Sequence, residues 1–233
     1  RWRLQLALQI PWVLRKGLRL LPCWMPGHPA AVNMSAGNHE TNMAQDKINA
    51  AVAQQIALLD PFLLSQRQVL HTLAEHLVAT FHQGGRLFLV GSGPFGSIAG
   101  LIGQSFLHRQ SLERPALPAI ALTNDAGLAT FLAADEQGSQ LFSRQLRALA
   151  CNQDTVMALA GVHLSPADRE ALGTASQLGC RSILIASEQV ELADILPDIS
   201  LSLPSDSLPR LQENTLFIGN LLCAMVEGEL FGT

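Results

Sequence analysis

The sequence predicts a three-layer α/β domain, in which helices cover both faces of a five-stranded parallel sheet in a Rossmann-like arrangement, preceded by N-terminal helices. From residue 86 onward, short apolar runs alternate with amphipathic segments, as is typical of a parallel sheet covered on both faces. Glycines follow the first apolar run at Gly91 and Gly93. Hydrophobic residues make up 48% of the 233 residues and charged residues 15%, which predicts a large buried core.

Residues 1–42 differ from the rest, because basic residues outnumber acidic ones there while the whole chain carries a net charge of −4. One interpretation is a basic amphipathic or targeting segment. The other, which we favour, is that this stretch is not native and that the protein starts at Met34 or Met43. We therefore divide the chain into residues 1–42 and a domain at 43–233.

Two helices are predicted before the first strand, at 44–59 and 65–81, because apolar residues recur there every three or four positions. Pro61 is expected to end the first helix, and Gly84 with Gly85 the second. No strand precedes these helices. We expect their apolar faces to pack on the domain and on a second subunit.

The remaining elements follow in alternation. The apolar runs predict strands at 86–90, 119–122, 155–160, 182–186 and 199–203. The segments between and after them predict helices at 97–108, 127–133, 139–150, 166–178 and 208–230. Ligands of such sheets bind at the carboxyl ends of the strands.

Composition excludes several classes of protein. The net charge of −4 argues against direct nucleic-acid binding. No uninterrupted apolar run reaches the length needed to span a membrane. The four cysteines are scattered without a Cys-x-x-Cys pair, so we expect neither a disulfide framework nor a zinc site, and place the protein in the reducing cytoplasm.

The segment Gly91-Ser92-Gly93 after the first strand suits a phosphate, because glycine lets a ligand approach the backbone and a helix N-terminus offers free N–H groups. The same pattern is typical of a plain tight turn between a strand and a helix. No acidic residue lies about 20 positions further on at the end of a strand, where a dinucleotide site needs one to hold the ribose.

From about Met43 to Phe231 the chain resembles the sugar isomerase (SIS) domain proteins of the phosphoheptose isomerase type. Within that family it looks closest to the non-catalytic proteins that associate with the initiator DnaA. The resemblance rests on Gly91–Gly93, Glu113–Leu122, Gln145–Leu149, Arg210–Glu213 and the terminal Leu230-Phe231.

The departures from the family pattern imply a lost activity. The serine that the isomerases use for the sugar phosphate is Phe95 here, and a hydroxyl-rich second loop reads Ala160-Gly161-Val162-His163-Leu164-Ser165. The His and Glu that serve the family as metal ligand and base are replaced by Leu101 and Ser105, and a later His by Asn220. We therefore expect no catalytic residues, no metal and no cofactor.

A degenerate phosphosugar pocket, able to bind a carbohydrate derivative, is nevertheless expected. We assign to it Gly91, Ser92, Gly93, Ser97, Asn124, Asp125, Ser165 and Gln212. Asn124 and Asp125 equally suit a turn or a helix N-cap. The terminal Leu230 and Phe231 are expected to contact a partner if exposed, or else to fold back onto the domain.

The function expected from these features is that of a non-catalytic, homotetrameric adaptor or regulator acting in DnaA-dependent replication initiation. The alternatives are a phosphosugar-binding sensor and a phosphoheptose isomerase acting on sedoheptulose 7-phosphate.

Overall fold

The computed structural model describes residues 34–110 and 112–232. One parallel sheet has the strand order β2-β1-β3-β4-β5. Its strands are β1 (Leu87–Gly91), β2 (Ala119–Ala121), β3 (Thr155–Leu159), β4 (Arg181–Ser187) and β5 (Ile199–Leu203). The predicted five-stranded parallel sheet is therefore confirmed.

The helices also follow the predicted order. They are α1 (Met34–Ser65), α2 (Arg67–His82), α3 (Pro94–Leu107), α4 (Ala126–Ala134), α5 (Leu141–Leu149), α6 (Pro166–Leu178) and α7 (Leu208–Phe231). The interpretation of residues 1–42 falls largely outside the described residues. Residues from Lys47 onward form one compact unit.

The prediction that Pro61 ends the first helix is wrong, since α1 continues through Pro61 to Ser65. Phe62, directly after the proline, is buried in the core. The backbone N–H of Gln66 donates to the carbonyl of Phe62 at 2.9 Å. Burial of the phenyl ring thus offsets the hydrogen bond that proline removes from the helix.

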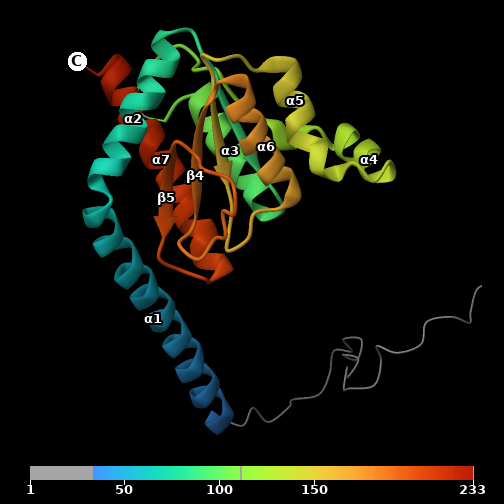
Figure 1. Ribbon diagram of the computed structural model, residues 1–233. Helices are drawn as coiled ribbons and strands as arrows, with labels where there is room; N and C mark the ends of the chain where they lie inside the picture. The colour runs from blue at the N-terminus through green and yellow to red at the C-terminus, as the bar shows by residue number, and fades with distance from the viewer. Residues whose placement is uncertain (1–33, 111, 233) are drawn as a thin grey trace, which may run out of the picture. The chain divides into compact units, whose positions relative to one another are not determined.

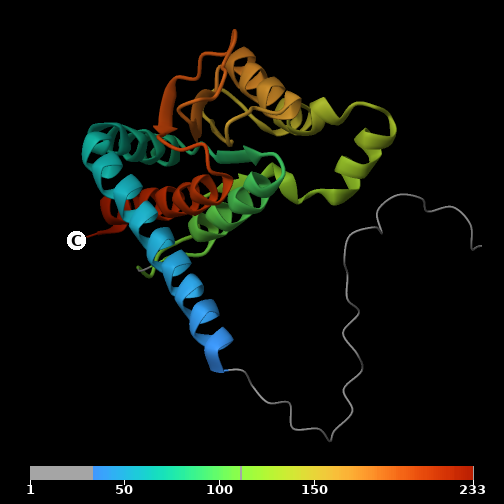
Figure 2. The ribbon, with the colours of Figure 1, turned by 90° about the horizontal axis from the view of Figure 1, so that it is seen from below.

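Helices cover both faces of the sheet. Figures 1 and 2 show α2, α3 and α7 on one face and α6 on the other. Alternate residues of β1 serve the two sides: Leu87 and Leu89 belong to the core under α2, α3 and α7, while Phe88 and Val90 belong to the core under α5 and α6. Each side of the sheet thus has its own apolar core.

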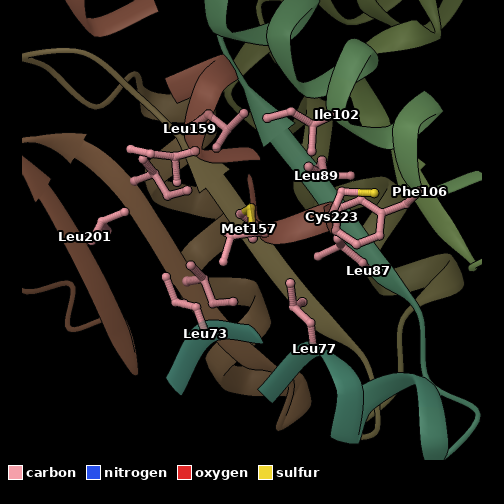
Figure 3. Close-up of a cluster of buried hydrophobic side chains, with 14 of the residues drawn as sticks. Leu73, Leu77, Leu87, Leu89, Ile102, Phe106, Met157, Leu159, Leu201 and Cys223 are labelled. Atoms are coloured by element: carbon pink, nitrogen blue, oxygen red, sulfur yellow. The ribbon is translucent and has the colours of Figure 1, made fainter. Parts of the chain in front are cut away.

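The first core joins distant parts of the chain (Figure 3). Leu73 and Leu77 of α2 contribute to it together with strand residues such as Met157 and Leu201. Gly219 of α7 lies directly against the side chain of Ile102 of α3. This close approach of α3 and α7 fixes both helices on the same side of β1.

Between β1 and β3, the direction in which successive parallel strands are added to the sheet reverses. β2 lies on one side of β1 and β3 on the other, while α3 packs on one face and α6 on the opposite face. Such a switch point leaves a crevice at the carboxyl ends of the two strands, where ligands of open α/β sheets bind.

Among the described residues, one helical stretch, Gln45–Ser65 of α1, has the length and hydropathy needed to cross a membrane. The sequence prediction of no such segment is therefore not supported for α1. Signal sequences and the mostly buried core helices of soluble proteins meet the same criterion. Its exposed apolar side chains include Ile48, Val52 and Ile56.

Candidate functional site

The loop between β1 and α3 needs its glycines. A side chain at Gly91 would lie 2.9 Å from the carbonyl of Phe95 and 3.0 Å from that of Leu159, closer than packed atoms allow. Gly93 has a φ of 57°, which favours glycine. Helix α3 begins at Pro94, three residues before the predicted start, because proline is suited to the first helical turn.

A cavity of about 320 Å³ opens beside this loop. It brings together five of the predicted ligand residues: Gly91, Ser92, Gly93, Ser97 and Asn124. Sequence reasoning missed Thr123, Leu141 and Phe142, which also line it. Nothing in the local pattern marks Leu141 and Phe142, because they arrive from helix α5.

Three of the predicted ligand residues have other surroundings. Asp125 is the N-cap of α4 and accepts a hydrogen bond from the N–H of Leu128 at 2.8 Å, as the N-cap alternative requires. Ser165 caps α6 within a capping box completed by Asp168. Gln212 lies in the first turns of α7 and does not line the cavity.

A hydrogen-bonded cluster of Ser92, Ser165 and Asp168 joins the β1–α3 loop to the β3–α6 loop. The two serine hydroxyl oxygens are 2.6 Å apart, and the Ser92 hydroxyl donates to Asp168 Oδ1 at 2.9 Å. The backbone N–H of Ser165 donates to Asp168 Oδ2 at 3.1 Å. Burial raises the pKa of Asp168 above its ordinary value, although these hydrogen bonds act in the opposite direction.

Phe95 closes the other side of the crevice between β1 and β3. Its side chain is buried, with 4% of its surface exposed. A side chain at Gly161 would lie 3.2 Å from the Phe95 ring and within 3.9 Å of Leu211. Phe95 thus fills the space between the two loops, whereas the cavity beside the β1–α3 loop stays open.

A second, larger cavity of about 670 Å³ lies between α3 and α7. It contains Leu101, Ser105 and Asn220, the positions that carry the acid–base residues in the family pattern. The Ser105 hydroxyl donates to Asn220 Oδ1 at 3.3 Å. His108 and Arg109, which sequence reasoning did not assign, also line this cavity.

No group of three or more His, Cys, Asp or Glu able to hold a metal ion occurs among the described residues. Burial raises the pKa of the Cys180 and Cys223 thiols to about 11. Raised pKa values favour the protonated thiols over the thiolates, and the Cys180 thiol donates a hydrogen bond to the carbonyl of Cys151 at 3.0 Å.

Leu230 and Phe231 are partly buried at the end of α7 and pack against the core under α2, α3 and α7. This is the fold-back arrangement that the sequence left open. DnaA as a partner stays an untested prediction.

Curated relatives identify the family. A phosphoheptose isomerase of Thermodesulfovibrio yellowstonii is 31% identical over 190 residues, covering 80% of this chain and 93% of that protein. One from Trichlorobacter lovleyi is 36% identical over 160 residues, covering 69% and 82% respectively. The chain belongs to the phosphoheptose isomerase family. A scan of protein-family models gives no match.

Solved structures support the same assignment to the phosphoheptose isomerase family. The phosphoheptose isomerase of Francisella tularensis is 28% identical with a TM-score of 0.73, covering 78% of this chain and 97% of that one. The NanR protein of Vibrio vulnificus, solved with ManNAc-6P, has a TM-score of 0.54 at 13% identity and shares the fold. The SIS-type fold predicted from the resemblance is confirmed.

The expectation of a non-catalytic adaptor is wrong. Relatives that are 31% to 36% identical over most of the chain are phosphoheptose isomerases, which favours the alternative functions. The expectation gave most weight to single replaced positions such as Leu101 and Ser105. Those replacements affect individual contacts in a site, whereas the relatives match along the length of the domain.

Proposed function

We propose that this member of the phosphoheptose isomerase family is a cytoplasmic protein that binds a phosphorylated sugar in the cavity of about 320 Å³ beside the β1–α3 loop. The observation that carries the proposal is the convergence of that loop with Ser97 and Asn124 at the carboxyl end of the sheet. Glycine backbone, a hydroxyl and an amide are groups that bind phosphate and sugar oxygens.

The first candidate activity is isomerisation of a phosphorylated heptose, because the relatives are named phosphoheptose isomerases. Binding without turnover is the second candidate. It is favoured by the larger cavity, where Leu101, Ser105 and Asn220 offer no carboxylate or imidazole at the acid–base positions of the family pattern.

Two alanine variants locate the binding site. With sedoheptulose 7-phosphate as ligand, we expect Asn124→Ala to weaken binding by about tenfold, the loss of one hydrogen bond to a charged group. The matched control is Asn220→Ala in the larger cavity, for which we expect no change. Calorimetric titration measures both. If Asn220→Ala weakens binding and Asn124→Ala does not, the binding site is the cavity between α3 and α7.

Turnover separates the two candidates. The aldose product formed from sedoheptulose 7-phosphate is followed by NMR with the full chain. Turnover that Asn124→Ala reduces supports isomerisation. Saturable binding without any product supports the second candidate, and absence of both binding and product would overturn the proposal.

We also propose that the chain assembles into a homotetramer through α1. The apolar side chains of Ile48, Val52 and Ile56 are each more than half exposed. They recur every four residues along one helix, as expected for a helix that packs against another.

A further inference from the structure

The protons of the Ser92–Ser165–Asp168 cluster can be assigned from its geometry. Asp168 is 2% exposed, and both of its carboxylate oxygens accept hydrogen bonds, from the Ser92 hydroxyl and from the Ser165 N–H. A hydroxyl has one proton to donate. Because Ser92 gives its proton to Asp168, the 2.6 Å contact between the two hydroxyls requires Ser165 to be the donor.

The Ser165 oxygen in turn accepts from the N–H of Asp168 at 3.1 Å. Both serine hydroxyl protons are therefore used within the cluster while Asp168 is ionised. Ser92, which lines the cavity, retains a free lone pair but no free proton. Toward a ligand, Ser92 is then an acceptor.

We propose that Asp168 determines which end of the ligand lies at Ser92: a sugar hydroxyl, which donates, rather than a phosphate oxygen, which only accepts. This inference rests on the proposed phosphosugar site. A buried carboxylate beside Ser92 also repels an anion there. The phosphate is thereby directed to the end of the cavity formed by Ser97 and Asn124.

Phe95 limits the alternatives for the phosphate. Its buried ring lies against Gly161 and fills the crevice on the side of α7. Ser97 and Asn124 are exposed and line the cavity, and both can donate hydrogen bonds. The cavity thus has an accepting end at Ser92 and a donating end at Ser97 and Asn124.

Asp168→Asn tests the assignment with little change of shape. The amide oxygen still accepts from the Ser165 N–H, and the amide nitrogen now donates to Ser92, which frees the Ser92 proton for a ligand. We expect the affinity for inorganic phosphate, measured by titration calorimetry, to rise about tenfold. Affinity for unphosphorylated sedoheptulose is expected to stay within about twofold.

Glu170→Gln is the matched control, since it removes one negative charge from the same helix, where Glu170 accepts from the Ser143 hydroxyl at 2.7 Å. We expect no gain in phosphate affinity from it. The inference is overturned if Asp168→Asn gains no phosphate affinity, if Glu170→Gln gains as much, or if sedoheptulose affinity rises in parallel. Circular dichroism of each variant establishes that it folds.

The role of Asp168 and the proposed function can each fail without the other. If wild type shows no affinity for sedoheptulose 7-phosphate while Asp168→Asn gains phosphate affinity, the function fails and the role of Asp168 stands. A second outcome is that wild type binds sedoheptulose 7-phosphate, while Asp168→Asn and Glu170→Gln bind inorganic phosphate no more tightly than wild type does. The proposed function then stands and the proposed role of Asp168 fails.

Discussion

At the scale of single residues, Arg114 connects the ends of two helices. Its Nε donates to Glu227 Oε1 at 2.8 Å, and its Nη1 and Nη2 donate to the carbonyls of Phe106 and Ser105 at the end of α3. The two charged side chains are 0% and 2% exposed. Arg114 thus satisfies helix carbonyls that have no partner within α3, as well as a buried carboxylate.

We expect Arg114→Leu to lower the free energy of unfolding by about 3–5 kcal/mol, because it removes the guanidinium from the buried Glu227 carboxylate and from two helix carbonyls. Urea denaturation followed by circular dichroism measures the change. Arg144→Leu is the control, since Arg144 is exposed and donates to the side chains of the nearby Gln140 and Gln137. A loss below about 1 kcal/mol for Arg114→Leu would show that the pair contributes little.

Asp154 supplies a pH dependence. Burial alone would raise its pKa, but hydrogen bonds from the Arg86 side chain and from the backbone N–H groups of Cys151 and Arg86 outweigh it and hold the pKa below 3.8. A depressed folded-state pKa means that its stabilising contribution is present above the unfolded-state pKa and is lost as pH falls through the folded-state value.

Asp154→Asn should therefore be less stable than wild type at pH 7, and the difference should shrink below about pH 3.8, near the ordinary aspartate pKa. Urea midpoints at pH 7, 5 and 3 measure it. A difference that stays constant across this range would exclude a charge effect and leave only a packing change.

At the scale of elements, Gly219 allows the close approach of α3 and α7. A methyl group there would overlap the side chain of Ile102. We expect Gly219→Ala to destabilise the protein by about 1–3 kcal/mol through overpacking. Thermal unfolding provides the measurement.

Gly173→Ala in α6 is the matched control, because an added methyl group there meets no atom within 4 Å. We expect it to stabilise the protein by roughly 0.5–1 kcal/mol, the ordinary helix preference for alanine. Equal effects of the two changes would mean that helix propensity rather than helix contact governs Gly219.

Helices and strands could be predicted where they depend on neighbouring residues in the sequence. The run Thr155–Leu159 is a buried strand, and Pro166 opens α6, as their sequences indicate. Continuation of α1 through Pro61 was not predictable, because it depends on burial of Phe62 in a core built from distant segments. The Arg114–Glu227 pair, 113 residues apart, was hidden for the same reason.

The candidate site shows the same division. The glycines of the β1–α3 loop and Asn124 follow directly from their positions at strand ends. The pairing of Ser92 with Asp168 spans 76 positions. Its one local sign is the spacing of Ser165 and Asp168, which is that of a capping box and by itself indicates a helix start rather than a site.

At the scale of the whole molecule, the exposed stripe of α1 predicts the assembly state. Replacing Val52 and Ile56 together by Asp should lower the mass measured by analytical ultracentrifugation, because charges on the stripe oppose burial. Leu196→Asp, at a position 87% exposed outside the helices, should leave the mass unchanged. A wild-type mass equal to one chain would overturn the tetramer.

The contact between Ser92 and Asp168 also has a kinetic meaning. It ties a loop on one side of the switch point to a loop on the other, so neither can swing outward alone without breaking it. In hydrogen–deuterium exchange, the amides of Gly93, Phe95 and Gly96 and those at 162–164 should open at a common rate, and Asp168→Ala should separate the two rates.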